Sequence, residues 1–171
     1  MDDPHPIQYD EIPRNSDERS TLLAFLEWQR ATLARKCEGL EPEQLRIRSA
    51  EPSTLSLLGL VRHMAEVERG WFRRTLAGED VPEIYCTEDD VDADFDHVDR
   101  ADVEEAFITW RDECSRADDI VSRRALEATG FQRTGREVSM RWILNHMIEE
   151  YSRHNGHADL IRERIDGATG Y

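Results

Sequence analysis

The stretch "SMRWILNHMIEEYSRHNGHADLIRERIDG", residues 139–167, repeats its apolar side chains with the period of an α-helix. At about 100° per residue, the apolar positions of such a helix gather in one quadrant that faces a core. These positions are Met140, Ile143, Met147, Tyr151, Ala158, Ile161 and Ile165. Gly167 follows the last of them, as is common just beyond a helix. The pattern predicts one long amphipathic helix from about Ser139 to Asp166.

Three further segments show the same period, and each is followed by a glycine suited to a helix end. They run from about Ser16 to Cys37, from about Thr54 to Ala77 and from about Ala101 to Glu127, followed by Gly39, Gly78 and Gly130. Strand signals are almost absent, although residues 131–140 leave room for a short extended piece. Four amphipathic helices in a chain of 171 residues predict an all-α domain, a four-helix bundle.

The ends and connections of these helices complete the predicted organisation. Asn15 with Glu18 resembles a capping box at the first helix, and Asp99 is the predicted cap of the third. Residues 1–15 are expected to form an N-terminal arm, and residues 16–171 the bundle domain. The link between the second and third helices, residues 78–100, is long enough for a crossover, so a simple up-down-up-down order is not required.

That link is also strongly acidic, and its stretch "DVDADFD" alternates aspartates as a calcium-binding loop does. If the loop begins at Asp92, His97 occupies the position of the turn glycine and Val103 that of the final glutamate. A calcium site is therefore not expected, and this stretch, residues 90–96, is interpreted as a solvated acidic loop.

The composition favours a soluble protein without a polyanionic partner. The sequence has 22 Lys and Arg against 37 Asp and Glu, a formal charge of -15, which repels nucleic acid and anionic membranes. No apolar run approaches the ~20 residues of a membrane span. Three scattered cysteines without a Cys-x-x-Cys spacing, and an N-terminus unlike a signal peptide, favour the cytoplasm.

Two polar residues fall inside the core quadrant of the last predicted helix. Glu150 and His154, one turn apart, project with its apolar side chains. A buried carboxylate without a partner costs several kcal/mol, so Glu150 must be paired, protonated or bound to a metal. Two interpretations stay open at this point. The two residues form an internal ion pair, or they grip one metal ion together with a ligand from a facing helix.

The candidate for that third ligand is His63, in "LLGLVRHMAEVERGWF", residues 57–72. It lies beside Val67 and Gly70 at the edge of the apolar face of the second predicted helix; a core histidine with an ordinary hydrogen bond is the alternative. Two histidines and one carboxylate, with positions left open, are typical of catalytic metals. Zn²⁺, Ni²⁺ and Fe²⁺ all accept these ligands.

Two other metal-binding motifs are not found in the sequence. The segment around His146 is not His-Glu-x-x-His, and the paired Glu-x-x-His motifs of di-iron bundles are missing. Cys37 and Cys114 fall on core stripes and are interpreted as packing residues.

Two motifs carry a family resemblance: "SLLGLVRHMAEVERGWFRR", residues 56–74, and "VSMRWILNHMIEEYSRHNGHADLIRERIDGATG", residues 138–170. Together they resemble the mini-circle-type family of uncharacterised actinobacterial proteins in the DinB-like superfamily. The resemblance implies a four-helix bundle in the order up-down-down-up that holds one divalent metal. The superfamily motif His-x-x-x-His-Arg-Gly falls on "EYSRHNG", so that Glu150 and His154 take the places of its histidines and His63 supplies the ligand from the second helix.

Glutamate at that place is similar to the mycothiol-dependent maleylpyruvate isomerases. Most of those isomerases carry a further C-terminal domain, whereas this sequence stops at Tyr171. The resemblance therefore implies a metal-dependent enzyme acting through a low-molecular-weight thiol, as an S-transferase or an isomerase. Two alternatives stay open: a metal-dependent hydrolase, and a non-enzymatic stress-associated bundle acting through its acidic surface or as a homodimer.

Four further residues are expected around the centre. His146 and His157 are candidates for orienting the ligands or carrying protons, and Trp71 and Tyr151, like Trp142, for shaping a pocket. Plain core packing is the alternative for the aromatic residues.

Overall fold

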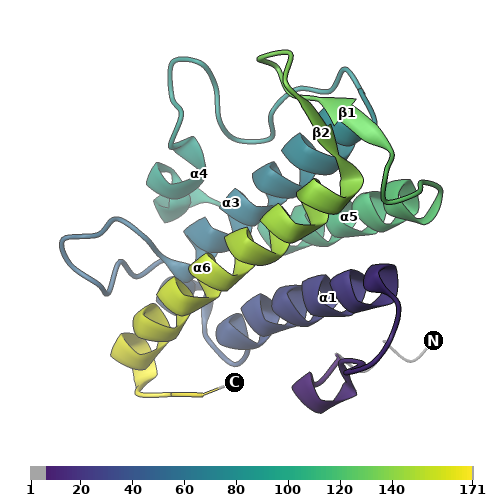
Figure 1. The fold of residues 1–171 in the computed structure, drawn as a ribbon. Coiled ribbons are helices and arrows are strands. Elements are labelled where there is room, and N and C mark those ends of the chain that lie inside the picture. The colour runs from purple at the N-terminus through teal and green to yellow at the C-terminus, as the bar shows by residue number, and fades with distance from the viewer. Residues whose placement is uncertain (1–6, 171) are drawn as a thin grey trace.

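The computed structural model describes residues 7–170. Its long helices are α1 (Glu18–Cys37), α3 (Leu57–Glu68), α5 (Val103–Ser122) and α6 (Met140–Asp166), and α3 continues without a break as a π-helix, η2 (Arg69–Leu76) (Figure 1). Short helical turns lie between them: η1 (Tyr9–Glu11), α2 (Pro42–Leu45), α4 (Ala93–Asp96) and η3 (Val98–Arg100). The predicted all-α four-helix bundle is confirmed.

One small hairpin accompanies the helices. Strands β1 (Thr129–Phe131) and β2 (Glu137–Ser139) pair antiparallel with Gly130 opposite Val138, so the expected extended piece near residue 131 exists. The hairpin stands over η2 at one end of the bundle (Figure 1). Within residues 7–170, no helix has the length and apolar character that crossing a membrane requires.

Contacts between side chains give the direction of the first and last helices. At one end of α6, Arg141 Nε lies 2.7 Å from Glu18 Oε1 of α1, and further along, Lys36 Nζ lies 2.5 Å from Asp159 Oδ1. From the first pair to the second, the residue numbers rise on both helices, so α1 and α6 run parallel.

The other two helices run the opposite way. Along α3 and η2, His63 meets His154 and Trp71 meets Trp142, so the numbers rise on one helix as they fall on the other. The segment just after α5 likewise bonds the start of α6, through the carbonyl oxygens of Leu126 and Ala128. Trp110, near the middle of α5, bonds Tyr151 further along α6. In chain order the four helices therefore run up, down, down and up.

The helix caps differ from two predictions. Asp17, and not Asn15, accepts the backbone N–H of Ser20 at 3.0 Å and begins α1. Asp102, and not Asp99, begins α5, because it is Asp102 whose carboxylate reaches a free N–H of the first turn. Asp99 instead pairs with an arginine, Arg48, at 2.7 Å.

Gly130 is also not a helix end, because α5 stops at Ser122 and Gly130 lies within β1. A Cβ on Gly130 would lie 2.1 Å from the backbone oxygen of Thr75. This glycine therefore permits the close approach of the hairpin to η2.

The N-terminal residues that the structure describes pack against the bundle. The ring of Tyr9 lies 5.2 Å from that of Trp28 on α1, edge to face, and Ile12 is buried. The predicted arm of residues 1–15 lies partly outside the described residues, and its boundary with the bundle domain stays a prediction.

Candidate metal centre

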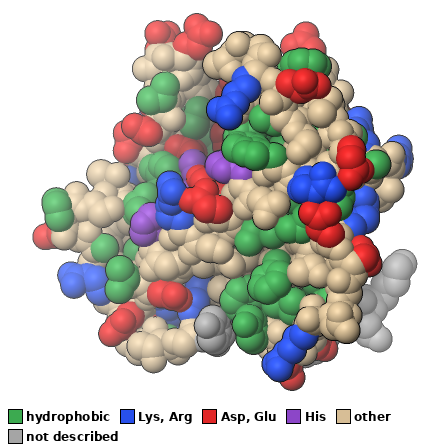
Figure 2. All heavy atoms as spheres, viewed as in Figure 1, with side chains coloured by type: hydrophobic (Ala, Val, Ile, Leu, Met, Phe, Trp, Pro, Cys, Tyr) green, Lys and Arg blue, Asp and Glu red, His purple; other side chains and the backbone are tan. Residues whose placement is uncertain are grey.

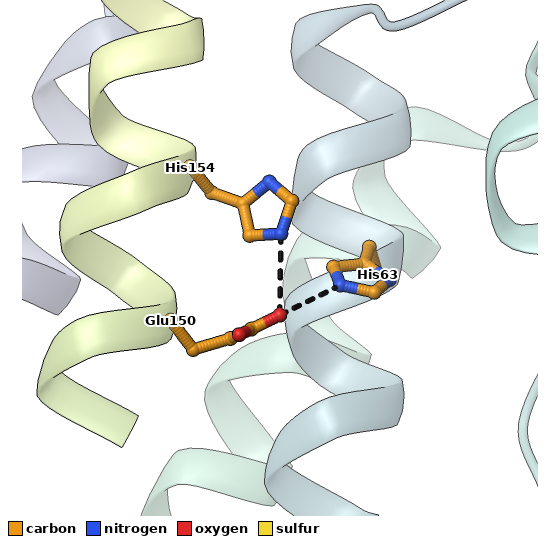
Figure 3. A group of neighbouring side chains, drawn as sticks. All are labelled: His63, Glu150 and His154. Atoms are coloured by element: carbon orange, nitrogen blue, oxygen red, sulfur yellow. Dashed lines mark ion pairs between the residues drawn. The ribbon is translucent and has the colours of Figure 1, made fainter. Parts of the chain in front are cut away.

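Helices α3 and α6 bring the three predicted ligands together. Nε2 of His154 lies 3.3 Å from Oε1 of Glu150, and Nε2 of His63 lies 3.5 Å from the same oxygen (Figure 3). One ligand atom from each residue lies within 4.8 Å of the others. The exposed fractions of the His63, Glu150 and His154 side chains are 22%, 16% and 11%, so the three side chains are largely buried but still reach solvent.

A buried polar network lies beside the centre, between the same two helices. The hydroxyl of Tyr151 donates to Oε1 of Glu68 at 2.8 Å and accepts a hydrogen bond from Trp110. Both oxygens of Glu68 also accept from Arg30 of α1 at 2.8 Å, which balances its buried charge. Because Tyr151 follows Glu150 directly, these bonds hold α6 in register with α3.

An aspartate that the sequence analysis did not single out completes the centre. Oδ2 of Asp94 lies 2.8 Å from Nδ1 of His63, and only 3% of Asp94 is exposed. The carboxylate accepts the Nδ1–H hydrogen bond, which leaves the lone pair on Nε2 of His63 facing Glu150. The interpretation of residues 90–96 as a solvated loop is therefore wrong at Asp94.

Two side chains of α3 place this aspartate. Arg62 donates to the carbonyl oxygens of Asp94 and Ala93 at 2.8 and 2.9 Å, and Glu66 accepts the backbone N–H groups of residues 84 and 85 at 2.9 and 2.8 Å. The ring of Phe95 stacks on His63 at 4.9 Å. The acidic link is thus fastened to the helix that carries His63. The only feature of its sequence that could have indicated a role at the centre was its number of carboxylates.

The charge state of the centre suits a cation. Burial lowers the pKa of His154 to about 4, with the neighbouring His63 acting in the same direction. Burial raises the pKa of Glu150, but the attraction of His154 and His63 outweighs it and holds that pKa below its ordinary value. At neutral pH the centre therefore contains an ionised carboxylate and a neutral His154 imidazole.

The residues present fit a divalent metal. Among the described residues, Nε2 of His63 is buried and has no hydrogen-bond partner, although it points at the carboxylate. Ligand atoms about 2.0–2.1 Å from a tetrahedral ion lie about 3.4 Å from one another, which is too long for a good hydrogen bond. The separations of 3.3 and 3.5 Å match that spacing. His63, Glu150 and His154 would hold the ion.

The other two histidines lie at the rim. Nδ1 of His157 is 3.4 Å from Nδ1 of His154, on the side of that ring away from Glu150. The ring of His146 stacks on Trp142 at 5.0 Å and meets Trp71 edge-on at 4.6 Å. Figure 2 shows histidine side chains reaching the surface here, beside a hydrophobic patch.

The two predicted pocket residues differ in their positions. Trp71 lines a surface groove of about 830 Å³ between η2, the following loop and the hairpin. Tyr151 is fully buried and lies in the polar network with Glu68. Its position in the core stripe could not reveal this, because the partner of its hydroxyl lies on another helix.

Comparison with known protein families identifies the family of this chain. Residues 21–167 match the family described as mycothiol-S-transferase. This chain belongs to the mycothiol S-transferase family. The predicted kinship with the DinB-like superfamily is thereby confirmed, and the family relationship covers α1 through α6 and every residue of the centre.

A solved structure shares the fold of this mycothiol S-transferase family member. YfiT from Bacillus subtilis, described as a probable metal-dependent hydrolase with an unusual four-helix bundle topology, is 16% identical with a TM-score of 0.66. The match covers 91% of this chain and 94% of YfiT. No curated protein matches the sequence.

Proposed function

We propose that this protein is a metal-dependent enzyme that transfers a substituent to the sulfur of a low-molecular-weight thiol, mycothiol. The observation that supports the proposal is the trio His63, Glu150 and His154 in a member of the mycothiol S-transferase family. The hydrogen bond from His63 to Asp94 adds to it, because such a contact typically orients a histidine ligand of a metal.

The chemistry requires a thiolate at neutral pH. A divalent ion, when bound, stabilises a thiolate over a thiol and so makes the sulfur a better nucleophile. The protein's own residues form the binding site for that ion. Asp94 keeps the proton of His63 on Nδ1, burial keeps His154 neutral, and Glu150 supplies the negative charge.

Hydrolysis is the second candidate, because the same donor set can activate water in place of a thiol. YfiT, which shares the fold, is described as a probable metal-dependent hydrolase. Transfer to a thiol is preferred here because the family match spans residues 21–167, whereas YfiT is only 16% identical.

The test begins with untagged protein and elemental analysis of its metal. Formation of a thioether from mycothiol and chlorodinitrobenzene is then followed with and without added Zn²⁺, Ni²⁺ or Fe²⁺. Glu150→Gln and His154→Gln should each lose bound metal and thioether formation together. His97→Gln serves as the matched control, because its imidazole is exposed and pairs with Asp90 away from the centre.

Three other outcomes contradict the proposal. Ester or amide cleavage that needs the metal but no thiol assigns the centre to hydrolysis. Metal binding without thioether formation and without hydrolysis would show that the protein does not catalyse either proposed reaction. A protein that binds no metal and sediments as a dimer supports the remaining alternative, a bundle that acts through association.

A further inference from the structure

A cavity near the centre does not include the three candidate ligands in its wall. It is the groove of about 830 Å³ that includes Trp71. A second cavity, of about 430 Å³, is lined by His63 and Asp94 and shares Glu83 and Arg133 with the groove. The groove therefore adjoins the cavity that His63 lines.

The π-helix makes a second connection between groove and centre. Trp71 of η2 lines the groove and also contacts the ring of His146, one turn before Glu150 on α6. Gly70, also in the wall, has open space where a side chain would begin. Such turns are frequent at functional sites. Here the π-helix presents an aromatic ring and leaves the wall open next to it.

The wall of the groove combines aromatic and hydrogen-bonding groups. Trp71 and Phe131 contribute aromatic rings, and 61% of Phe131 is exposed. Arg74 and Arg133 each donate to Oε1 of Glu83, at 2.7 and 2.8 Å. The two guanidinium groups retain further N–H donors, and the other oxygen of Glu83 remains an acceptor.

The charge of this wall excludes some ligands. Two arginines face three acids, Glu79, Asp80 and Glu83, so the groove has one net negative charge on a protein of formal charge -15. An anionic ligand such as a phosphate would be repelled. Alternating donors and acceptors between aromatic faces instead suit a neutral molecule with many hydroxyl groups and apolar C–H faces.

We propose that this groove binds the polyhydroxylated, sugar-like body of the thiol substrate, and that Phe131 and Arg133 of the hairpin determine its selection. The inference rests on the proposed function, because it assigns a position to the part of the substrate that does not react. Mycothiol fits this chemistry, since it is a cysteine derivative carried on a glucosamine joined to inositol. With the sugar and inositol in the groove, the thiol would extend past Glu83 and Arg133 into the adjoining cavity that His63 lines.

The test uses the whole protein and the thiol-free fragment of mycothiol, glucosaminyl-inositol, in titration calorimetry. Phe131→Ala and Arg133→Ala should each weaken its binding about 5- to 10-fold, because one aromatic or charged contact is removed. Both side chains are mostly exposed, so the variants should fold. Leu160→Ala and Arg111→Ala are matched controls outside the groove and should bind as the wild type does.

The same preparations separate this inference from the proposed function. If the wild type does not bind the fragment, or if the two hairpin variants bind it unchanged, the groove proposal is overturned. Metal-dependent conjugation of cysteine, which lacks the sugar, would in that case still support the centre. If the fragment binds and the hairpin variants weaken it, but no metal and no conjugation are found, the groove stands and the proposed reaction fails.

Discussion

Asp94 accepts a hydrogen bond from His63 at 2.8 Å, and through it the loop before α5 determines which nitrogen of that imidazole faces Glu150. Asp94→Ala should therefore weaken Zn²⁺ binding by about 10- to 100-fold, as loss of such orienting partners does at metal centres. Competition with a chromophoric chelator measures the change.

Asp92→Ala is the control, because that side chain is exposed on the same loop. Equal affinity in both variants would mean that Asp94 only stabilises the loop and does not orient the ligand.

The metal-free protein should lose stability in mildly acidic solution. In the unfolded chain His154 takes up its proton near its ordinary pKa of 6.5, whereas in the folded chain burial delays this to about 4. Between these values the unfolded state holds more protons, so falling pH favours unfolding. The unfolding free energy from urea titration should drop by about 2 kcal/mol more in the wild type than in His154→Gln between about pH 7.5 and about pH 5.

The depressed pKa of Glu150 acts in the same direction at the acidic end, because the folded state also resists protonating that carboxylate. A wild type and a His154→Gln variant with parallel pH profiles would show that His154 is not held neutral by the fold.

The native thiols should react slowly with disulfide reagents. Burial raises the pKa of Cys37 to about 12 and that of Cys86 to about 11, so little thiolate exists near about pH 8. In buffer, the absorbance with Ellman's reagent should rise slowly. In urea it should rise at once and account for three equivalents of thiol, one for each cysteine. One fast equivalent in the native protein would identify an activated cysteine and call into question a reaction whose sulfur comes from the ligand.

Substitutions of two glycines should change the free energy of unfolding in opposite directions. Gly130→Ala places a methyl group 2.1 Å from the backbone oxygen of Thr75 and should destabilise the protein by about 1–3 kcal/mol. Gly156→Ala, within α6 and facing open space, should stabilise it by about 0.5–1 kcal/mol. Urea titration of both variants is the measurement. A Gly130→Ala variant as stable as the wild type would show that the hairpin can move away from η2.

The positions of Glu150, His154 and His63 could be predicted from the sequence because each depends on helical periodicity alone. Residues spaced by four share a face, and a histidine at the edge of an apolar stripe must meet another helix. The helices that carry the ligands were predicted for the same reason.

Asp94 could not be predicted in this way, because α4, which carries it, has four residues and is too short to show a helical period. Which of its acids turns inward depends on Arg62 and Glu66, which hold the loop backbone from another part of the chain. The role of Tyr151 escaped prediction for a related reason, since its hydroxyl binds Glu68 on a different helix. Asn15 and Asp17 are equally good caps by residue type, and only the geometry of the first turn distinguishes them.

The parallel pairing of α1 with α6 joins the first and last helices that the structure describes, and α6 also carries two of the three candidate ligands. During synthesis His63 and Asp94 leave the ribosome long before Glu150 and His154. A metal centre built from all three candidate ligands could therefore form only after α6 has been made and has packed against α1 and α3.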